Sequence, residues 1–312
     1  MTKIAVISDV HANIDGLGLV LKDIEQRGVD KMVCLGDLVT KYFYPDQVVD
    51  AIKKNCDIVV QGNCDNLVSS DIRYKFARSK LGIDNIEYLS NLPSREQLLV
   101  SGSLLTFFHA SPESVNAMFN PLFDNENTKY AKYQIDDFHD MFIPKKIIEE
   151  RFKKYADGPQ LSICGHTHQS YIGLVEDSDL KIILDNKKEQ NESINLKGEN
   201  AIINTGSVGE AVTLKYPDSY EPFLIDESLS YLIIEGDLDS KRVQDLKVQI
   251  IKIPYKQTLK KVYFDMLIGQ AKGSFPNSPK DTEKVRKSLL AMDEVDIDKE
   301  ASSIISSEGI KK

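Results

Sequence analysis

The chain has 312 residues, of which 28% are charged and 41% belong to the hydrophobic set, a composition typical of a folded globular protein. The formal net charge of -9 disfavours nonspecific binding to nucleic acid, because an acidic surface repels polyanions unless basic side chains cluster locally. No apolar run reaches the ~18–20 residues that a membrane span needs, and Ile4–Ile7 is too short for the core of a secretory signal.

The four cysteines, Cys34, Cys56, Cys64 and Cys164, form no C-x-x-C pair, so we expect no structural zinc site. Cys34 and Cys164 lie inside short apolar runs and are predicted to be buried. This cysteine usage predicts reduced thiols and a cytoplasmic location.

Six short apolar runs recur along the chain, and runs of this length are typical of strands buried on both faces. They are Ile4–Ile7, Met32–Leu35, Ile58–Val60, Leu104–Phe108, Leu161–Cys164 and Ala201–Ile203. Helical spacing from Leu17 to Ile24, closed by Gly28, and a second helix beginning at Pro45 separate the first three runs. This β-α-β-α-β order predicts that the sheet begins with parallel strands.

The later segments have a different character. Residues 113–157 are predicted to form a helical insertion, either a lid that shapes the substrate site or a surface ornament. Ile172–Val175 and Leu180–Leu184 flank a turn and predict a hairpin, and further strands are predicted at Tyr231–Ile234 and at Leu246–Ile250. Residues 186–200 are polar and predicted to be a loop. Helical patterns follow Pro254, so we expect a main domain at 1–256 and a C-terminal helical extension at 257–312.

Residues of metal-ligating type follow five of the predicted strands. They are Asp9 and His11, then Asp37, then Asn63 and Asp65, then His109, then His166 and His168. Ligands in open α/β sheets bind outside the carboxyl ends of the strands, so we expect these side chains to converge at one edge. Four of the five histidines have such a position, whereas His139 lies in the insertion and is predicted to be a surface residue.

Imidazole mixed with carboxylate oxygen is a ligand set that suits zinc, iron, manganese or nickel. Without Asp65, seven candidate ligands remain; they exceed the needs of one ion, but they fit two ions that share a carboxylate.

The motifs Asp-Val-His, Gly-Asp, Gly-Asn-Cys-Asp, His-Ala and Gly-His-Thr-His resemble, in this order, the five motifs of calcineurin-like metallophosphoesterases. The resemblance covers roughly residues 1–254 and is greatest to the small bacterial and archaeal phosphodiesterase branch, in which the stretch Asn204–Gly209 also recurs. It implies an α/β (α+β) fold, a four-layer α/β/β/α sandwich of two mixed sheets flanked by helices. The hairpins after Ile172 would supply the second sheet.

The resemblance also implies the ligands of two divalent ions, with Mn²⁺ favoured and Fe, Zn or Ni as alternatives. Asp9, His11 and His168 would hold the first ion, Asn63, His109 and His166 the second, and Asp37 would bridge them. A hydroxide bridging the ions would attack phosphorus, with catalytic roles for Asp37, Asn63, Asp65 and His109.

Several roles around these ligands stay open. The Asn63 amide would donate to a phosphate oxygen, and Asn13 would either do the same or cap the following helix. Gly206 and Ser207 would line the site or form a tight turn. Asp65 would orient a histidine ligand from behind.

Cys64 is a departure from many relatives, which carry histidine there as the proposed proton donor to the leaving group. A thiol is a poor substitute, which favours a phosphodiesterase acting on a small phosphorylated or nucleotide-like substrate. The alternatives are a phosphomonoesterase or Ser/Thr protein phosphatase, a non-catalytic scaffold, and a nuclease with a basic patch from Lys145 to Lys154. Homo-oligomerisation stays open.

Overall fold

The computed structural model describes residues 1–40, 44–70, 75–112, 114–116, 159–176, 179–184, 193–209, 212–214, 223–225 and 228–255. Nearly all of the predicted insertion, including His139 and the basic run at 145–154, lies outside these residues, as do the helices predicted after residue 256. Within the described residues, no helix has the length and apolar character needed to cross a membrane.

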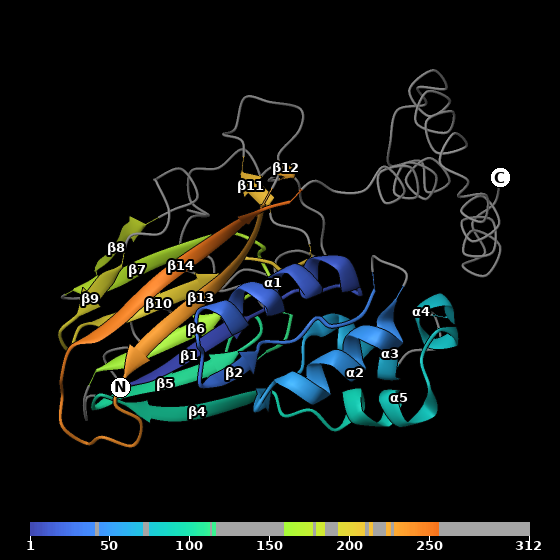
Figure 1. Cartoon of the computed structure of the whole chain (residues 1–312), viewed down its shortest axis with the longest axis horizontal. Helices are drawn as coiled ribbons and strands as arrows, with labels where there is room; N and C mark the ends of the chain where they lie inside the picture. The colour runs from blue at the N-terminus through green and yellow to red at the C-terminus, as the bar shows by residue number, and fades with distance from the viewer. Residues whose placement is uncertain are drawn as a thin grey trace.

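The first of two six-stranded sheets begins with the parallel strands β1 (Thr2–Ile7), β2 (Lys31–Cys34) and β3 (Ile58–Val59). On the other side of β1 it continues antiparallel through β13 (Ser228–Gly236), β14 (Leu246–Pro254) and β9 (Ile194–Leu196). The sheet order is therefore β3-β2-β1-β13-β14-β9, a mixed sheet whose parallel half was predicted (Figure 1).

The second sheet has the order β4-β5-β6-β10-β7-β8. Its strands are β4 (Arg95–Val100), β5 (Ser103–Phe108), β6 (Gln160–Cys164), β10 (Asn200–Thr205), β7 (Ser170–Glu176) and β8 (Asp179–Leu184). The three central strands β5, β6 and β10 are parallel, and the outer pairings are antiparallel. A small separate ladder joins β11 (Val212–Leu214) to β12 (Phe223–Ile225).

The described helices are α1 (Ile14–Gln26), α2 (Pro45–Asn55), α3 (Asn63–Ser70), α4 (Lys75–Ser79) and α5 (Ile83–Ser90). Helix α1 buries one apolar stripe that includes Leu17 and Val20, and Gly28 follows its end at φ 61°, where a side chain would be strained. Pro45 occupies the first turn of α2, where its missing N–H costs nothing.

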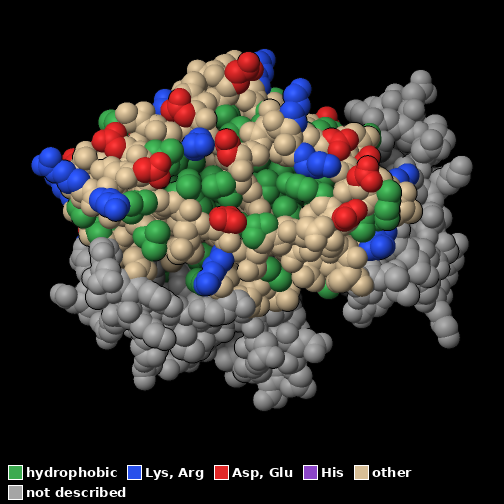
Figure 2. Space-filling model, turned by 90° about the horizontal axis from the view of Figure 1, so that it is seen from below, with side chains coloured by type: hydrophobic (Ala, Val, Ile, Leu, Met, Phe, Trp, Pro, Cys, Tyr) green, Lys and Arg blue, Asp and Glu red, His purple; other side chains and the backbone are tan. Residues whose placement is uncertain are grey.

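Alternating side chains of β1 build two cores. Ala5 and Ile7 pack with the apolar faces of the helices, whereas Ile4 and Val6 pack with the side chains of the second sheet. The first sheet therefore lies between a helical layer and the second sheet (Figure 1). Among the described residues on the face shown in Figure 2, acidic and basic side chains are interspersed, with no large patch of one sign.

All six predicted apolar runs are strands. The structure also confirms the β7–β8 hairpin, the strands β13 and β14, and the first two helices. Cys34 and Cys164 are buried, as predicted. Two expectations were wrong. The polar segment 186–200 contains β9, which pairs with β14. The hairpins after Ile172 were expected to supply the second sheet, and the β7–β8 hairpin does belong to it, but β4, β5, β6 and β10 form the rest and the β13–β14 hairpin joins the first sheet.

Candidate metal centre

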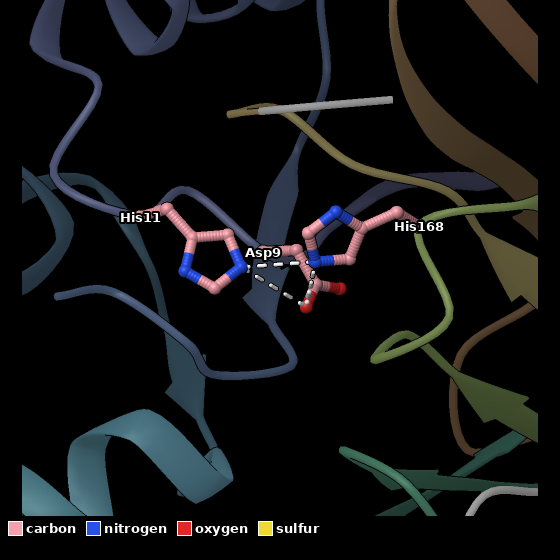
Figure 3. A group of neighbouring side chains, drawn as sticks. All are labelled: Asp9, His11 and His168. Atoms are coloured by element: carbon pink, nitrogen blue, oxygen red, sulfur yellow. Dashed lines mark hydrogen bonds and ion pairs between the residues drawn. The ribbon is translucent and has the colours of Figure 1, made fainter. Parts of the chain in front are cut away.

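The loops that follow β1, β2, β5 and β6 meet with the start of α3 at one end of the sandwich. The ligands converge as expected, and they come from both sheets, because β1 and β2 belong to the first sheet and β5 and β6 to the second. Figure 3 shows Asp9 between His11 and His168, with the Nε2 atoms of both rings turned toward the carboxylate.

The backbone at this centre is unusual. Asp9, His11, Asp37, His166 and His168 have positive φ angles of 56°, 52°, 54°, 67° and 59°. Such left-handed conformations cost roughly 1–2 kcal/mol for residues other than glycine. Backbone hydrogen bonds hold two of them, from Asp9 N to Gly36 O (3.0 Å) and from His11 N to Asp37 O (2.8 Å). These turns direct the ligand side chains toward a common centre.

A first group comprises Asp9, His11 and His168, whose ligating atoms lie within 4.8 Å of one another. His11 Nε2 is 2.9 Å from His168 Nε2, and Asp9 Oδ1 is 3.3 Å from His168 Nε2 and 3.8 Å from His11 Nε2. The other carboxylate oxygen, Asp9 Oδ2, accepts the backbone N–H of His166 at 2.8 Å, which orients Oδ1 into the group.

A second group comprises Asp37, His109 and His166, again within 4.8 Å. His109 Nε2 is 3.1 Å from His166 Nδ1 and 3.0 Å from Asn63 Oδ1, so the Asn63 carbonyl oxygen faces the same point. His109 Nδ1 lies 2.8 Å from the carbonyl oxygen of Leu35, which fixes the ring as a donor on that side.

Asp37 lies between the two groups. Its Oδ2 is 3.7 Å from His11 Nε2, and its Oδ1 is 3.4 Å from His109 Nε2. The backbone N–H of Cys64 donates to Oδ1 at 2.8 Å and holds the carboxylate in this orientation. One oxygen therefore faces each group, which is the arrangement that a bridging ligand requires.

The donor set fits cations. Because the carbonyl oxygen of Leu35 accepts the Nδ1 proton of His109, loss of the second ring proton turns the Nε2 lone pair toward the acceptor oxygens of Asn63 and Asp37. Asp9 Oδ1 is fully buried and accepts no hydrogen bond from the described residues. Ligand nitrogen and oxygen atoms that turn their lone pairs toward one another, with no hydrogen-bond donor between them, repel each other unless a positive charge lies between them.

The electrostatics point the same way. Burial raises the pKa of Asp37, but His109 and His11 outweigh it and hold that pKa well below its usual range. Burial lowers the pKa of His109, yet the Asp37 and Asp9 carboxylates outweigh it and raise the pKa to about 9. Burial and the adjacent His109 lower the pKa of His166 to about 4. The two carboxylates thus favour a positive charge on His109, and burial next to His109 disfavours a proton on His166.

Asp65 is fully buried and supports the backbone of the site. Its Oδ2 accepts the N–H groups of Asp37 (2.8 Å) and Gly62 (3.0 Å), and its Oδ1 accepts that of Leu38 (2.9 Å). Burial and the Asp37 carboxylate raise the pKa of Asp65 to about 7, against the N–H groups of Gly62 and Leu38, which lower it. Asp65 was expected to orient a histidine, whereas these contacts bind the loops that carry Asp37 and Asn63.

Asn13 caps α1, as one of its two expected roles requires. Its Oδ1 accepts from Gly16 N at 3.0 Å and from the Tyr255 hydroxyl at 3.2 Å, and its Nδ2 donates to the Gly209 carbonyl at 3.0 Å. These contacts join the His11 loop to Gly209.

The segment 204–209 is hydrogen-bonded to the loops that carry the ligands. The Ser207 hydroxyl donates to the backbone carbonyl of Asp9 at 2.8 Å, and Gly206, at φ 77°, has no room for a side chain because Ser230 lies against it. The sequence had given Asn204 no role of its own. Its Nδ2 donates to Gly165 O at 2.6 Å and to Thr167 Oγ1 at 3.1 Å, which fixes the loop between the two histidines of Gly-His-Thr-His.

Cys64 lies at the accessible side of the centre. Its side chain is half-buried, like those of Asn63 and His166, whereas Asp9, His11 and His109 are almost completely buried. The Asn63 amide donates to its sulfur at 3.7 Å. Cys64, Asn63 and His166 are therefore the more exposed residues of the centre.

A family model described as the calcineurin-like phosphoesterase superfamily domain matches residues 2–227. The chain belongs to this superfamily. Together with the buried His/Asp cluster, this makes the protein a metal-dependent phosphoesterase, a hydrolase. The family membership and the two mixed sheets confirm the resemblance read from the five motifs.

Relatives span most of the chain. An uncharacterized protein of Methanocaldococcus jannaschii is 28% identical over 276 residues, which cover 83% of this chain and 90% of that protein. A metallophosphoesterase from Sphaerobacter thermophilus has a similar structure, with a TM-score of 0.57, 21% identity, and coverage of 89% of this chain and 96% of its own. A hypothetical protein from Pyrococcus horikoshii gives a TM-score of 0.53 at 16% identity, covering 82% and 90%. These structural likenesses support the fold.

Proposed function

We propose that this metallophosphoesterase is a phosphodiesterase that uses two divalent ions, with Mn²⁺ favoured, to hydrolyse a small phosphorylated or nucleotide-like substrate. The observation that carries the proposal is the Asp37 carboxylate, which turns one oxygen toward each of two buried ligand groups. Asp9, His11 and His168 would hold one ion, and Asn63, His109 and His166 the other. Two such ions supply an activated water nucleophile and neutralise charge on the phosphate.

The side chains of this chain position the substrate. Because Asn63 turns its carbonyl oxygen toward His109, its amide N–H group is directed to the accessible side, next to Cys64. There it would donate to a nonbridging phosphate oxygen. The segment 204–209 and Asp65 occupy the buried side of the centre. The ester would therefore enter from the side of the half-buried residues Asn63, Cys64 and His166.

Protonation of the leaving group favours diesters and activated esters. The four histidines of the centre all belong to the two ligand groups. The half-buried thiol of Cys64 takes the position at which the motif resemblance implies a histidine in many relatives. A thiol donates a proton weakly, so a leaving group that needs little protonation reacts best. An alkyl phosphomonoester, whose leaving group is a strong base, is disfavoured.

The choice between diester and monoester is tested with paired aryl esters in the presence of Mn²⁺. Wild-type protein is expected to hydrolyse a bis-aryl phosphate with a kcat/KM at least about tenfold above that for the mono-aryl phosphate, or about 1.4 kcal/mol. A monoester rate far above the diester rate would overturn the proposal in favour of a phosphomonoesterase or protein phosphatase. Fewer than about one bound ion per chain after Mn²⁺ loading, with no hydrolysis, would indicate a scaffold.

The formal net charge of -9 favours a small substrate over a polynucleotide. The four cysteines are free thiols, and the cytoplasmic location inferred from cysteine usage stays a prediction, as do the domain boundaries and homo-oligomerisation.

A further inference from the structure

We infer that the Cys64 thiol is an additional ligand of the metal centre, one that thiophilic ions such as Zn²⁺ and Cd²⁺ recruit and Mn²⁺ does not. The inference rests on the proposed two-metal function and adds a soft donor to a centre otherwise built from nitrogen and oxygen. It predicts that the protein distinguishes metals by sulfur coordination.

The geometry is that of a third ligand group. The ligating atoms of His11, Asp37 and Cys64 all lie within 4.8 Å of one another. The Cys64 backbone N–H donates to Asp37 Oδ1 at 2.8 Å, so the residue that carries the thiol is fixed to the bridging carboxylate. His11 belongs to this group and also to the group with Asp9 and His168, so the thiol lies beside the first ligand group and shares a ligand with it.

The distances suit a small ion. Ligand atoms around a tetrahedral zinc ion lie about 3.3–3.8 Å apart, given metal–ligand bonds of about 2.0–2.3 Å. His11 Nε2 and Asp37 Oδ2, 3.7 Å apart, already have this spacing, and a rotation of the short Cys64 side chain can adjust the position of the sulfur. Coordination releases the thiol proton to solvent as the sulfur–metal bond forms, so charge and atoms balance without an oxidant or reductant.

The chemistry makes the extra ligand selective. Thiolates favour zinc and cadmium over manganese, which prefers oxygen and imidazole. Because Cys64 lies on the accessible side, its sulfur would also occupy the position from which the substrate approaches. Zn²⁺ or Cd²⁺ would then bind tightly and inhibit the hydrolysis that Mn²⁺ supports.

The test is a Cd²⁺ titration of wild type, Cys64→Ser and Cys56→Ser, followed by ultraviolet absorption and metal analysis. Wild type and Cys56→Ser are expected to develop a sulfur-to-cadmium charge-transfer band that Cys64→Ser lacks. Cys64→Ser should bind Cd²⁺ about tenfold or more weakly while its Mn²⁺ affinity changes less than about threefold. Circular dichroism checks that each variant is folded, and Cys64→Ala provides a second variant that lacks the thiol.

Two outcomes overturn the inference: Cd²⁺ bound at the centre without the band in wild type, or a band of equal strength in Cys64→Ser. Both can occur while two Mn²⁺ ions still bind and support hydrolysis, which leaves the proposed function standing. Failure of every variant and of wild type to bind any divalent ion would instead overturn both proposals.

Discussion

Replacing Asp37 by Asn should remove one metal ion selectively. The backbone N–H of Cys64 donates to Asp37 Oδ1 at 2.8 Å and requires an acceptor there. The amide oxygen of the variant will therefore take the Oδ1 position, beside His109, and the NH₂ group will take the Oδ2 position, 3.7 Å from His11 Nε2 in the native protein. The ion on the His11 side loses its shared oxygen and meets a donor group instead.

The expected loss of activity follows from this geometry. The ion beside His109 keeps an oxygen ligand, whereas the ion beside His11 retains only Asp9 and the two imidazoles. Hydrolysis that needs both ions should fall at least about a hundredfold, or about 3 kcal/mol of transition-state stabilisation. Metal content should fall from about two ions to about one per chain.

The assay combines aryl phosphodiester kinetics with metal analysis after dialysis, with Asp84→Asn as a matched control because Asp84 is exposed at the start of α5. Adding His168→Ala to Asp37→Asn should leave metal content unchanged, whereas adding His166→Ala should abolish binding. Retention of both ions with activity within about tenfold of wild type would refute the reasoning. Loss of the ion on the His109 side first would refute it as well.

Three further predictions concern the support of the centre and the stability of the fold. Asp65→Ala leaves three buried N–H donors without acceptors and should lower the free energy of unfolding by about 3 kcal/mol in urea denaturation of metal-free protein; a change under about 1 kcal/mol contradicts this. Asn204→Ala should weaken Mn²⁺ binding about tenfold and lose activity that excess Mn²⁺ restores; loss that no Mn²⁺ concentration reverses would count against a positioning role. Burial raises the pKa of Asp23, but hydrogen bonds from Arg27 and Tyr231 outweigh burial and lower that pKa. The Asp23 carboxylate therefore stabilises the folded protein above the unfolded pKa of about 3.9, and this stabilisation is lost as the pH falls. The stability difference between wild type and Asp23→Asn should therefore shrink from about pH 6 to about pH 3, and a difference that grows in acid would be contrary to the account.

The strands and ligands could be predicted because their signal is local. A run such as Ile4–Ile7 is buried on both faces and therefore continuously apolar, and the polar residues that follow it must leave the sheet. The sheet to which each strand belongs could not be predicted, because β5 and β6 are as apolar as β1 and β2. Partner choice depends on tertiary packing that the pattern does not encode.

The missed elements have weak local patterns. Strand β4 begins with the exposed residues Arg95, Glu96 and Gln97 at the edge of its sheet, so only its second half is apolar. Strand β9 has three residues and depends on pairing with β14. The left-handed turns at the ligands and the three N–H contacts of Asp65 arise between loops far apart in sequence, and no single motif predicts them.

The central claim is tested most directly by a crystal grown with Mn²⁺ and measured at the manganese absorption edge. The account predicts two anomalous peaks about 3.5–4 Å apart, one among Asp9, His11 and His168, the other among Asn63, His109 and His166, with Asp37 between them. A single peak, or none within coordination distance of these side chains, would contradict it.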